Sequence, residues 1–451
     1  MLPPADTEAE ERVPEPVAPA APGLLGVVAL PGLAIWRRSP TVGALLFIAG
    51  VFAPAFALIL VLQHRSDLVG LFTRPNVLRG LGLAALAGIA SRLIAVWLTA
   101  DRVRDPAAQH HFRVVGSAAV VCLALPTALV VVRMEEARGV VKQVFQESSA
   151  SGSVSAGKDV DPLSGEFHTV LLMGSDEGED RIGLRTDSMI IAFVHDKSGR
   201  AALVSVPRNL LDLQFPPGSV LAKRYPQGFD DSEGGLVNSV YMTVENDETL
   251  RAAYSKGSNE AGTQALMEGL SYSLGITLDD YALINSCGFV KVVDAIGGIT
   301  ITIDKELPMP SKLPCSNYRL TPTIGPGETY MDGTKALGYV RSRTGDSDYL
   351  RMDRQRLLLQ TIADEIGFGD LLLRFGDLAD AVKDNVQTSM TVEEARTLLA
   401  TLRDSGQEFE SVGLAPPLLE PSRPDYTALK ALLQRIRRAL ADGTALDLPT
   451  E

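Results

Sequence analysis

The apolar residues of this chain are concentrated in its first third, whereas the rest alternates short apolar segments with polar ones. Three apolar runs, at residues 41–62, 80–100 and 114–132, approach the roughly 20 residues that an α-helix needs to cross a bilayer. Such runs can also form the buried helices of a soluble protein. Three of them in close succession favour a membrane region over residues 23–132.

Arginines at the ends of these runs indicate an orientation. Arg37 and Arg38 precede the first run, and Arg102, Arg104 and Arg113 lie between the second and the third. Cytoplasmic loops are enriched in Lys and Arg, although the loop between the first two runs carries arginines as well. We therefore predict three crossings that leave everything after the third run outside the cell.

The remaining segments differ in composition. Residues 1–22 are rich in Pro, Ala and Glu, which predicts a disordered tail, and residues 23–36 are apolar but short, which suggests an interfacial or re-entrant segment. Residues 133–165 are polar and end in a Ser- and Gly-rich stretch, which predicts a linker. Residues 166–445 then have the length and pattern of one globular domain.

Short apolar runs and helical periodicities alternate in this domain. The expected strands cover residues 168–174, 188–196, 200–208, 280–285, 299–303 and 336–343, and the expected helices cover residues 260–275, 286–298, 347–366 and 391–402. Gly275 should end the first helix, and Thr391 with Glu394 has the spacing of a capping box. The pattern predicts an α/β fold with a mixed central sheet flanked by helices, an α-β-α sandwich.

Charge and cysteine content narrow the range of ligands. The 451 residues carry 55 acidic and 42 basic side chains, and the net charge of −13 argues against a general nucleic-acid binder. An anionic ligand would therefore need a local cluster of arginines. Cys287 and Cys315 could form a disulfide if the domain is outside the cell, but their spacing does not decide it.

Such a cluster occurs in the stretch "YVRSRTGDSDYLRMDRQ". On a strand, Arg341 and Arg343 would point to the same face. On the helix that follows, Arg351, Arg354 and Gln355 have i, i+3, i+4 spacing and would share a face, and guanidinium groups match phosphate oxygens two at a time. The alternative is a solvated surface, balanced by the interspersed aspartates.

A second group of charged residues surrounds two expected strand ends. Asp176 follows the first strand, and Arg185 and Asp187 open the next one. Two carboxylates at adjacent strand ends can hold Mg²⁺, although Asp is also common in ordinary turns. Arg208 stands where the third strand ends, in "SVPRN", near the edge where ligands of α/β sheets gather.

The sequence lacks the residues and motifs that several other kinds of catalytic or binding site require. The domain has only two histidines, so a histidine-based triad is disfavoured, and the chain has no phosphate-binding GxxxxGK[ST] loop, no HExxH and no CxxC pair.

At this point the sequence resembles the LytR-CpsA-Psr family of cell-wall phosphotransferases. The matching stretches are "VLLMGSD…RTDSMII", "LVSVPRN", "LVNSVY", "DYALINSCGFVKVVDAIGGITI" and "MDGTKALGYVRSRTGDSDYLRMDRQ", in the order of the family, over about residues 168–360. The resemblance implies a membrane-anchored protein with an extracytoplasmic domain. It also implies transfer of a glycopolymer from a polyprenyl-pyrophosphate carrier to peptidoglycan through a phosphodiester link.

The resemblance also implies roles for single residues. Asp176 and Asp187 would hold Mg²⁺, and the residues around the pyrophosphate would be Arg185, Arg208, Arg341, Arg343, Arg354 and Gln355. We expect Asp176, Arg185, Asp187 and Arg343 to be the catalytic set. The family usually has Asp where this chain has Asn209, which removes a carboxylate from that position without removing Arg208.

Two alternatives remain open from the sequence. The same site could pass the phosphate to water and act as a pyrophosphatase. The domain could also be a lipid-binding regulator without turnover. The glycopolymer is not identified, because an arginine site would recognise the diphosphate that all such carriers share.

Overall fold

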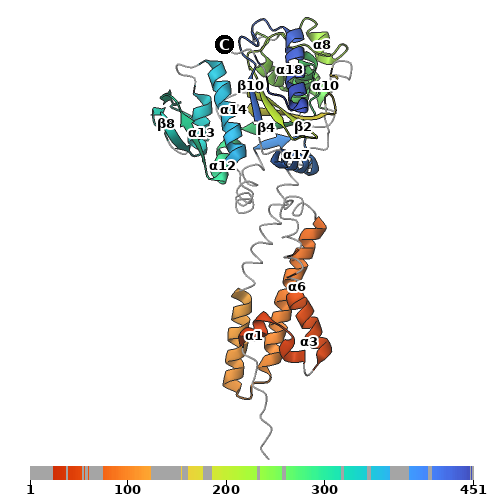
Figure 1. Ribbon diagram of the computed structural model, residues 1–451, viewed down its shortest axis with the longest axis vertical. Helices are drawn as coiled ribbons and strands as arrows, with labels where there is room; N and C mark the ends of the chain where they lie inside the picture. The colour runs from red at the N-terminus through yellow and green to blue at the C-terminus, as the bar shows by residue number, and fades with distance from the viewer. Residues whose placement is uncertain are drawn as a thin grey trace, which may run out of the picture. The chain divides into compact units, whose positions relative to one another are not determined.

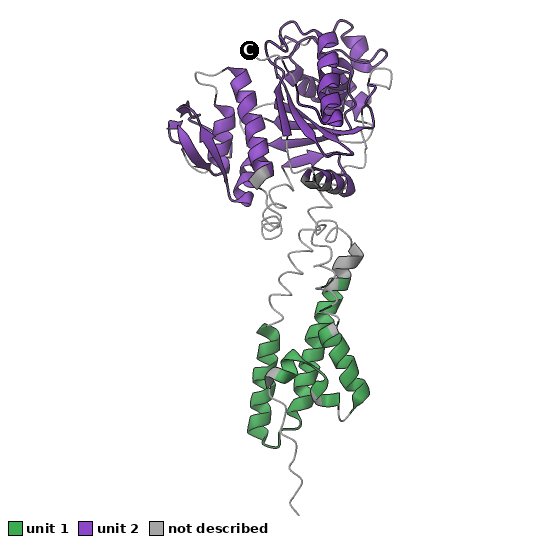
Figure 2. Ribbon diagram, in the orientation of Figure 1, with its two compact units in different colours: residues 1–134 green, residues 135–451 purple. Residues whose placement is uncertain are grey.

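The computed structural model divides into two compact units, residues 1–134 and 135–451, which are taken separately below (Figure 2). The residues that the structure describes are 24–36, 39–52, 55, 59, 75–122, 154, 161–175, 185–230, 234–255, 261–315, 319–342, 347–365, 385–404, 409–446 and 448. Asp176 and Arg343, both predicted site residues, lie outside them, as does the predicted tail 1–22.

The first unit is helical. Its elements are α1 (Leu24–Ala29), α2 (Leu33–Trp36), α3 (Pro40–Phe47), the π-helical η1 (Ile48–Phe52) and α6 (Pro75–Ala100), and residues 106–122 are also helical. Within the described residues, one helix, Gly82–Ala100, is long and apolar enough to cross a membrane. It coincides with the second predicted span. The other two predicted spans are described only in part, so their number stays a prediction.

The apolar segment at residues 23–36 packs against α6. Val28 and Ile35 are buried in a cluster with Ala95 and Val96 of that helix. Arg92, which interrupts the apolar run of α6, donates from Nε to the Val28 carbonyl at 3.1 Å. A cation that bonds to backbone carbonyls inside an apolar helix pair has its charge partly compensated.

The second unit is built on a mixed six-stranded sheet in the order β10-β3-β2-β1-β4-β9 (Figure 1). The strands are β1 (Phe167–Ser175), β2 (Thr186–His195), β3 (Ala201–Val206), β4 (Asp280–Asn285), β9 (Val386–Thr388) and β10 (Phe409–Gly413). β1 pairs with β2 antiparallel and with β4 parallel, and β2 and β3 form the predicted hairpin. The predicted mixed central sheet is confirmed.

Both faces of the sheet are covered, which explains the near-continuous apolar runs of its strands. Leu171 and Ile191 are paired in register and belong to the main core, which includes residues of α11 and α18. Leu172, Ile190 and Ala282 lie in one row across β2, β1 and β4, on the opposite face. Figure 1 shows α14 and α18 on the two sides of the sheet.

Helices of the main-core side are α8 (Val220–Arg224), η2 (Val237–Ser239), α9 (Val240–Asn246), α10 (Glu248–Tyr254), α11 (Ala261–Leu274) and α18 (Tyr426–Asp442). α11 ends at Gly275, whose φ of 67° is in the left-handed region, as predicted. A further helix, α17 (Val392–Asp404), begins with the predicted capping box: Thr391 N donates to Glu394 Oε2 at 2.7 Å and Glu394 N to Thr391 Oγ1 at 3.2 Å.

The opposite side carries a second apolar cluster. It is formed by α12 (Ser286–Ile296), α13 (Gly333–Arg341), α14 (Asp348–Glu365) and two small sheets, β5 (Ile299–Ile303) with β8 (Gly327–Met331) and β6 (Leu307–Pro308) with β7 (Thr323–Ile324). The expected strand 299–303 exists, but it pairs with β8 and not within the central sheet. Cys287 and Cys315 form a disulfide, which the sequence left open.

One predicted strand is wrong. Residues 336–343 were expected to be extended, but residues 333–341 form helix α13. The Asp332 side chain accepts from Lys335 N at 2.9 Å and caps this helix. A short apolar run with polar neighbours fits the periodicity of a helix as well as that of a strand, and here the Asp332 N-cap favours the helix. Arg341 therefore lies at the end of a helix and not on the predicted strand.

The domain also begins earlier than residue 166. Val154 forms a bridge with Leu278, and the Asp161 carboxylate is fully buried. Asp161 accepts from Arg437 of α18 at 2.7 Å, and the Arg437 guanidinium lies 5.0 Å from the centre of the Phe167 ring. Part of the predicted linker 133–165 is therefore fixed to the sheet and to α18.

Candidate active site

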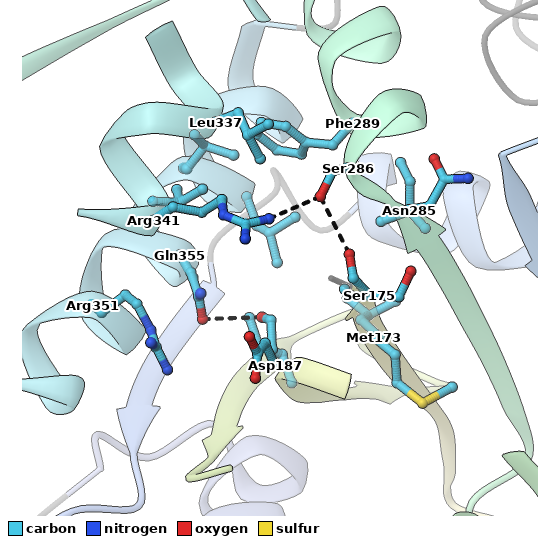
Figure 3. Close-up of a pocket in the computed structure, with 18 of the residues that line it drawn as sticks. Met173, Ser175, Asp187, Asn285, Ser286, Phe289, Leu337, Arg341, Arg351 and Gln355 are labelled. Carbon is cyan, nitrogen blue, oxygen red and sulfur yellow. Dashed lines mark hydrogen bonds between the residues drawn. The ribbon is translucent and has the colours of Figure 1, made fainter. Parts of the chain in front are cut away.

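A cavity of about 480 Å³ lies on the face of the sheet that is covered by α12, α13 and α14 (Figure 3). Its walls come from the carboxyl ends of β1 and β4, the start of β2 and these three helices. The polar lining residues are Ser175, Asp187, Ser188, Asn285, Ser286, Lys312, Arg341, Arg351 and Gln355. Most of the other lining residues are apolar, so the cavity combines a polar region with an apolar body.

Asp187, at the start of β2, is the predicted carboxylate that the structure places in the cavity wall. Its Oδ1 lies 3.3 Å from a guanidinium nitrogen of Arg208 and accepts from Asn238 Nδ2 at 3.3 Å. Asn238 is nearly fully buried, and its Oδ1 has no hydrogen-bond partner among the described residues. The Asp187 carboxylate is thus held between the Arg208 guanidinium and the Asn238 amide nitrogen.

Arg208 connects this carboxylate to the first turn of α14. Its Nε donates to Asp348 Oδ2 at 3.0 Å, and Asp348 Oδ1 lies 3.2 Å from Arg351. Burial alone would lower the pKa of Arg208, but the hydrogen bond and charge of Asp348, together with Asp187, raise it above its ordinary value. Arg208, a predicted site residue, therefore stays positively charged. It lies beside the cavity and does not line it.

Helix α14 presents two of its three predicted polar residues to the cavity. Arg351 and Gln355, which are i and i+4, both line it, and Gln355 Oε1 accepts from Ser188 Oγ at 3.0 Å. Ser347 caps this helix, because its Oγ accepts from Leu350 N at 3.3 Å.

Arg354 turns away from this face. Its Nε donates to Tyr339 O at 3.1 Å and a terminal nitrogen donates to Ser342 O at 2.7 Å, so the buried guanidinium satisfies carbonyls at the end of α13. The expectation that Arg351, Arg354 and Gln355 share one working face is therefore wrong for Arg354. Its contact with a pyrophosphate stays a prediction without support from this geometry.

Arg341 reaches the cavity from the last residue of α13. A guanidinium nitrogen donates to Ser286 Oγ, at the start of α12, at 3.0 Å. The two helices approach closely because residue 333 is glycine: a Cβ there would lie 2.1 Å from the Val290 carbonyl oxygen. The hydrogen bond holds Arg341 and Ser286 opposite each other (Figure 3).

The remaining predicted site residues are Arg185, Asp176 and Arg343. Arg185 directly precedes β2, is half-buried and is not in the cavity wall. Asp176 and Arg343 lie outside the described residues, so their roles stay predictions.

Sequence reasoning did not select Ser175, Asn285, Ser286 and Lys312, and it left Arg351 out of the expected pyrophosphate contacts. The i, i+4 relation of Arg351 to Gln355 and the strand-to-helix junction at Asn285 were available signals. Lys312 carries no signal of its own in the sequence. Its loop reaches the cavity through the disulfide of Cys315 and the packing of Leu313.

Two relatives resemble this chain over part of its length. Biofilm regulatory protein A of Streptococcus mutans is 27% identical over 257 residues, which are 56% of this chain and 56% of that protein. The polyisoprenyl-teichoic acid–peptidoglycan teichoic acid transferase TagU of Oceanobacillus iheyensis is 26% identical over 295 residues, 63% of this chain and 78% of that protein. The matched region is thus little more than half of the first relative.

Two solved structures also resemble part of this chain. Protein gbs0355 from Streptococcus agalactiae gives a TM-score of 0.45 at 23% identity and covers 66% of this chain and 94% of that one. TagV from Bacillus subtilis gives a TM-score of 0.43 at 20% identity and covers 62% of this chain and 99% of that one.

A family model, described as the LytR_cpsA_psr family, matches residues 139–413, which include every described element that forms the cavity. Because this match covers well over half of the chain, the protein belongs to the LytR_cpsA_psr family.

Proposed function

We propose that this protein transfers a glycopolymer from a polyprenyl-pyrophosphate carrier to peptidoglycan and forms a phosphodiester link. The name of the Oceanobacillus iheyensis relative, a transferase between these two kinds of molecule, supports the reaction class. The observation that carries the proposal is the cavity itself, in which two arginines and a carboxylate share one space with an apolar body.

The apolar body suits a prenyl chain. Met173, Ile190, Phe289, Leu337 and Leu358 line it, from both the sheet and the helices that cover it. A volume of about 480 Å³ is within the range of ligand cavities in proteins. It would hold the part of the carrier nearest the diphosphate, with burial of apolar surface as the driving force.

The polar end suits a diphosphate. The Arg341 and Arg351 guanidinium groups line the cavity, and each has several N–H donors that match phosphate oxygens. An acceptor hydroxyl of peptidoglycan would attack the phosphorus attached to the sugar. The bond from that phosphorus to the bridging oxygen would break, polyprenyl phosphate would leave and the hydroxyl proton would be released. The arginines would stabilise the charge that develops on the phosphate oxygens.

Mg²⁺ is the expected cofactor, and one described residue supports it. Mg²⁺ in phosphoryl-transfer sites uses one or two carboxylates together with water and substrate phosphate. The Asp187 carboxylate in the cavity wall is an oxygen ligand of the required type. With Asp176 as the second expected carboxylate, a bound ion would neutralise diphosphate charge.

We further propose that the protein is anchored in the cell membrane by three spans, with residues after the third span outside. The helix Gly82–Ala100 and the arginines that flank the apolar runs support this arrangement. A disulfide between Cys287 and Cys315 is compatible with an oxidising compartment.

The test is an incubation of the full chain in detergent with Mg²⁺, a short-chain polyprenyl-diphosphate-linked sugar and a peptidoglycan fragment, followed by mass spectrometry. The proposal predicts a sugar–phosphate–peptidoglycan adduct. Free sugar phosphate without adduct would establish a pyrophosphatase instead. Tight binding of the carrier with no product would leave a lipid-binding regulator.

A further inference from the structure

We infer that the disulfide between Cys287 and Cys315 is a redox-sensitive tie that holds one wall of the cavity, the strap of residues 310–315. Reduction of this disulfide should release the strap and weaken binding of the carrier. The inference rests on the proposed function in one respect, namely that the apolar body of the cavity binds the prenyl chain of the carrier.

The disulfide joins two parts of the cavity wall that are 28 positions apart in the chain. Cys287 is the second residue of α12, between Ser286 and Phe289, which both line the cavity (Figure 3). The strap supplies three further lining residues, Pro310, Lys312 and Leu313. The covalent bond therefore fixes the strap against the part of α12 that faces the cavity.

Few other interactions hold the strap. Just before it, Met309 N donates to Pro322 O at 2.8 Å. Within the described residues, no hydrogen bond joins residues 310–315 to another part of the chain. Leu313 is half-buried against the second apolar cluster, and it packs close to Gly338 of α13, where a Cβ would lie 3.4 Å from Leu313 Cδ1. The position of the strap thus depends on the disulfide and on one apolar side chain.

The backbone at Cys315 is a second, independent observation. Its φ of 58° lies in the left-handed region, which is uncommon for a residue with a side chain. A backbone in such a conformation persists where the surrounding structure holds it. Once the disulfide is broken, Cys315 can return to an ordinary conformation, and that change moves the end of the strap away from α12.

The disulfide is within reach of a thiol reagent, because Cys315 is exposed. A thiolate of an extracytoplasmic dithiol attacks the Cys315 sulfur, the bond between the two cysteines breaks, and Cys287 leaves as a thiolate that takes up a proton. The second thiol of the reductant then displaces Cys315. Two electrons and two protons pass to the protein, and the reductant becomes a disulfide.

Release of the strap should affect carrier binding more than the chemical step. Pro310 and Leu313 are part of the apolar wall, so their loss removes surface that would be buried against the prenyl chain. Asp187 is held by Arg208 and Asn238, and Arg341 by Ser286, through contacts that do not involve the strap.

The first test is limited trypsin digestion of the full chain in detergent, with and without dithiothreitol, followed by mass spectrometry. Cleavage after Lys312 should be about tenfold faster in the reduced chain, because a released strap can open to enter the protease. Cleavage after Lys197, in the exposed turn between β2 and β3, is the internal reference and should not change.

Two variants complete this test. Cys122→Ser is the matched control, since Cys122 is an exposed free cysteine, and this variant should respond to the reductant as the parent chain does. The double variant Cys287→Ser with Cys315→Ser should be cleaved rapidly after Lys312 whether or not the reductant is present.

The second test measures transfer as a function of carrier concentration. Reduction of the parent chain should raise KM for the carrier about tenfold and leave kcat within about twofold, and reoxidation should restore both. The double variant should have the high KM under both conditions.

The outcomes separate this inference from the proposed function. Unchanged cleavage after Lys312 in a chain whose three cysteines are all reduced would overturn the strap, as would faster cleavage with an unchanged KM. Absence of transfer by the oxidised parent chain would overturn the proposed function, whereas the digestion would still report whether the disulfide holds the strap. Should the double variant not fold, reduction of the folded parent chain decides the question.

Discussion

The guanidinium of Arg208 lies 3.3 Å from the carboxylate of Asp187 and links it to Asp348, 3.0 Å away on the other side. Three elements are joined through this arginine: the start of β2, the exit of β3 and the first turn of α14. The polar end of the cavity is therefore a connected network, in which a change at one residue should affect the orientation of the others.

Asp187 is the residue whose change should have the largest effect. Asp187→Asn keeps the shape of the side chain but removes the negative charge that orients Arg208 and that would hold Mg²⁺. We expect transfer to fall roughly a hundredfold or more. Initial rates with the polyprenyl-diphosphate-linked sugar measure it. Asp353→Asn, which removes an exposed carboxylate paired with Arg356 on α14, is the control and should retain activity. Equal rates in both variants would contradict the assignment of Asp187.

By the family resemblance, Arg343→Ala should also abolish transfer.

Arg351 should need the planar fork of its guanidinium and not only its charge. Arg351→Lys preserves the charge but cannot contact Asp348 and a phosphate in the same way. The expected result is a decrease of about tenfold in kcat/KM, measured by varying the carrier substrate. Arg356→Lys, on the same helix but outside the cavity wall, should leave kcat/KM near the parent value. A fully active Arg351→Lys variant would exclude a bidentate role.

Arg354 should matter for stability before it matters for catalysis. Arg354→Ala leaves the Tyr339 and Ser342 carbonyls at the end of α13 without their donors. We expect a loss of about 2 kcal/mol in the free energy of unfolding. Chemical denaturation of the parent and variant chains in detergent measures it. Unchanged stability combined with lost transfer would instead restore Arg354 to the group of substrate-binding residues.

The contact between His168 and Asp280 lies away from the cavity and should make the stability of the fold depend on pH. Its Nε2 lies 3.1 Å from Asp280 Oδ2, and this contact, opposed by burial and assisted by the charges of Asp279 and Asp196, raises the pKa of His168. A histidine with a raised folded-state pKa stabilises the fold fully below its ordinary pKa of about 6.5, and that contribution is lost as the pH rises through the folded-state pKa.

The melting temperature of the parent chain should therefore fall with rising pH above about 6.5. The slope should be shallower in His168→Gln, which has no titrating group, and in Asp280→Asn, which removes the facing carboxylate. Scanning calorimetry from pH 6 to 9 compares the three chains. A parent slope that His168→Gln reproduces would assign the pH dependence to another group.

The sequence predicted the four inner strands of the sheet, β1 to β4, because they are bounded by clear turns and buried on both faces, as the paired residues Leu171 and Ile191 illustrate. The two short edge strands, β9 and β10, were not predicted. It failed at residues 336–341, an apolar run that is compatible with either a helix or a strand. The Asp332 side chain caps a helix there. Arg354 and Arg351 look equivalent in sequence. Only the position of the α13 carboxyl end, which tertiary packing sets, directs Arg354 to backbone carbonyls and leaves Arg351 in the cavity.

Ser175 and Ser286 could not have been selected from the sequence, since a serine at a strand end or helix start is ordinary. Their relevance depends on the contact between β1, α12 and Arg341, which joins residues far apart in the chain. The disulfide between Cys287 and Cys315 likewise depends on a separation in space that spacing in sequence does not determine.

The central claim is that the phosphate next to the sugar is retained in the product. The most direct measurement uses a polyprenyl-diphosphate-linked sugar with radioactive phosphorus in the sugar-proximal phosphate only, incubated with the full chain, Mg²⁺ and a peptidoglycan fragment. The account predicts that the label becomes attached to the peptidoglycan fragment, with unlabelled polyprenyl phosphate as the other product. Label released entirely as soluble sugar phosphate, or left on the lipid while the sugar is transferred, would contradict it.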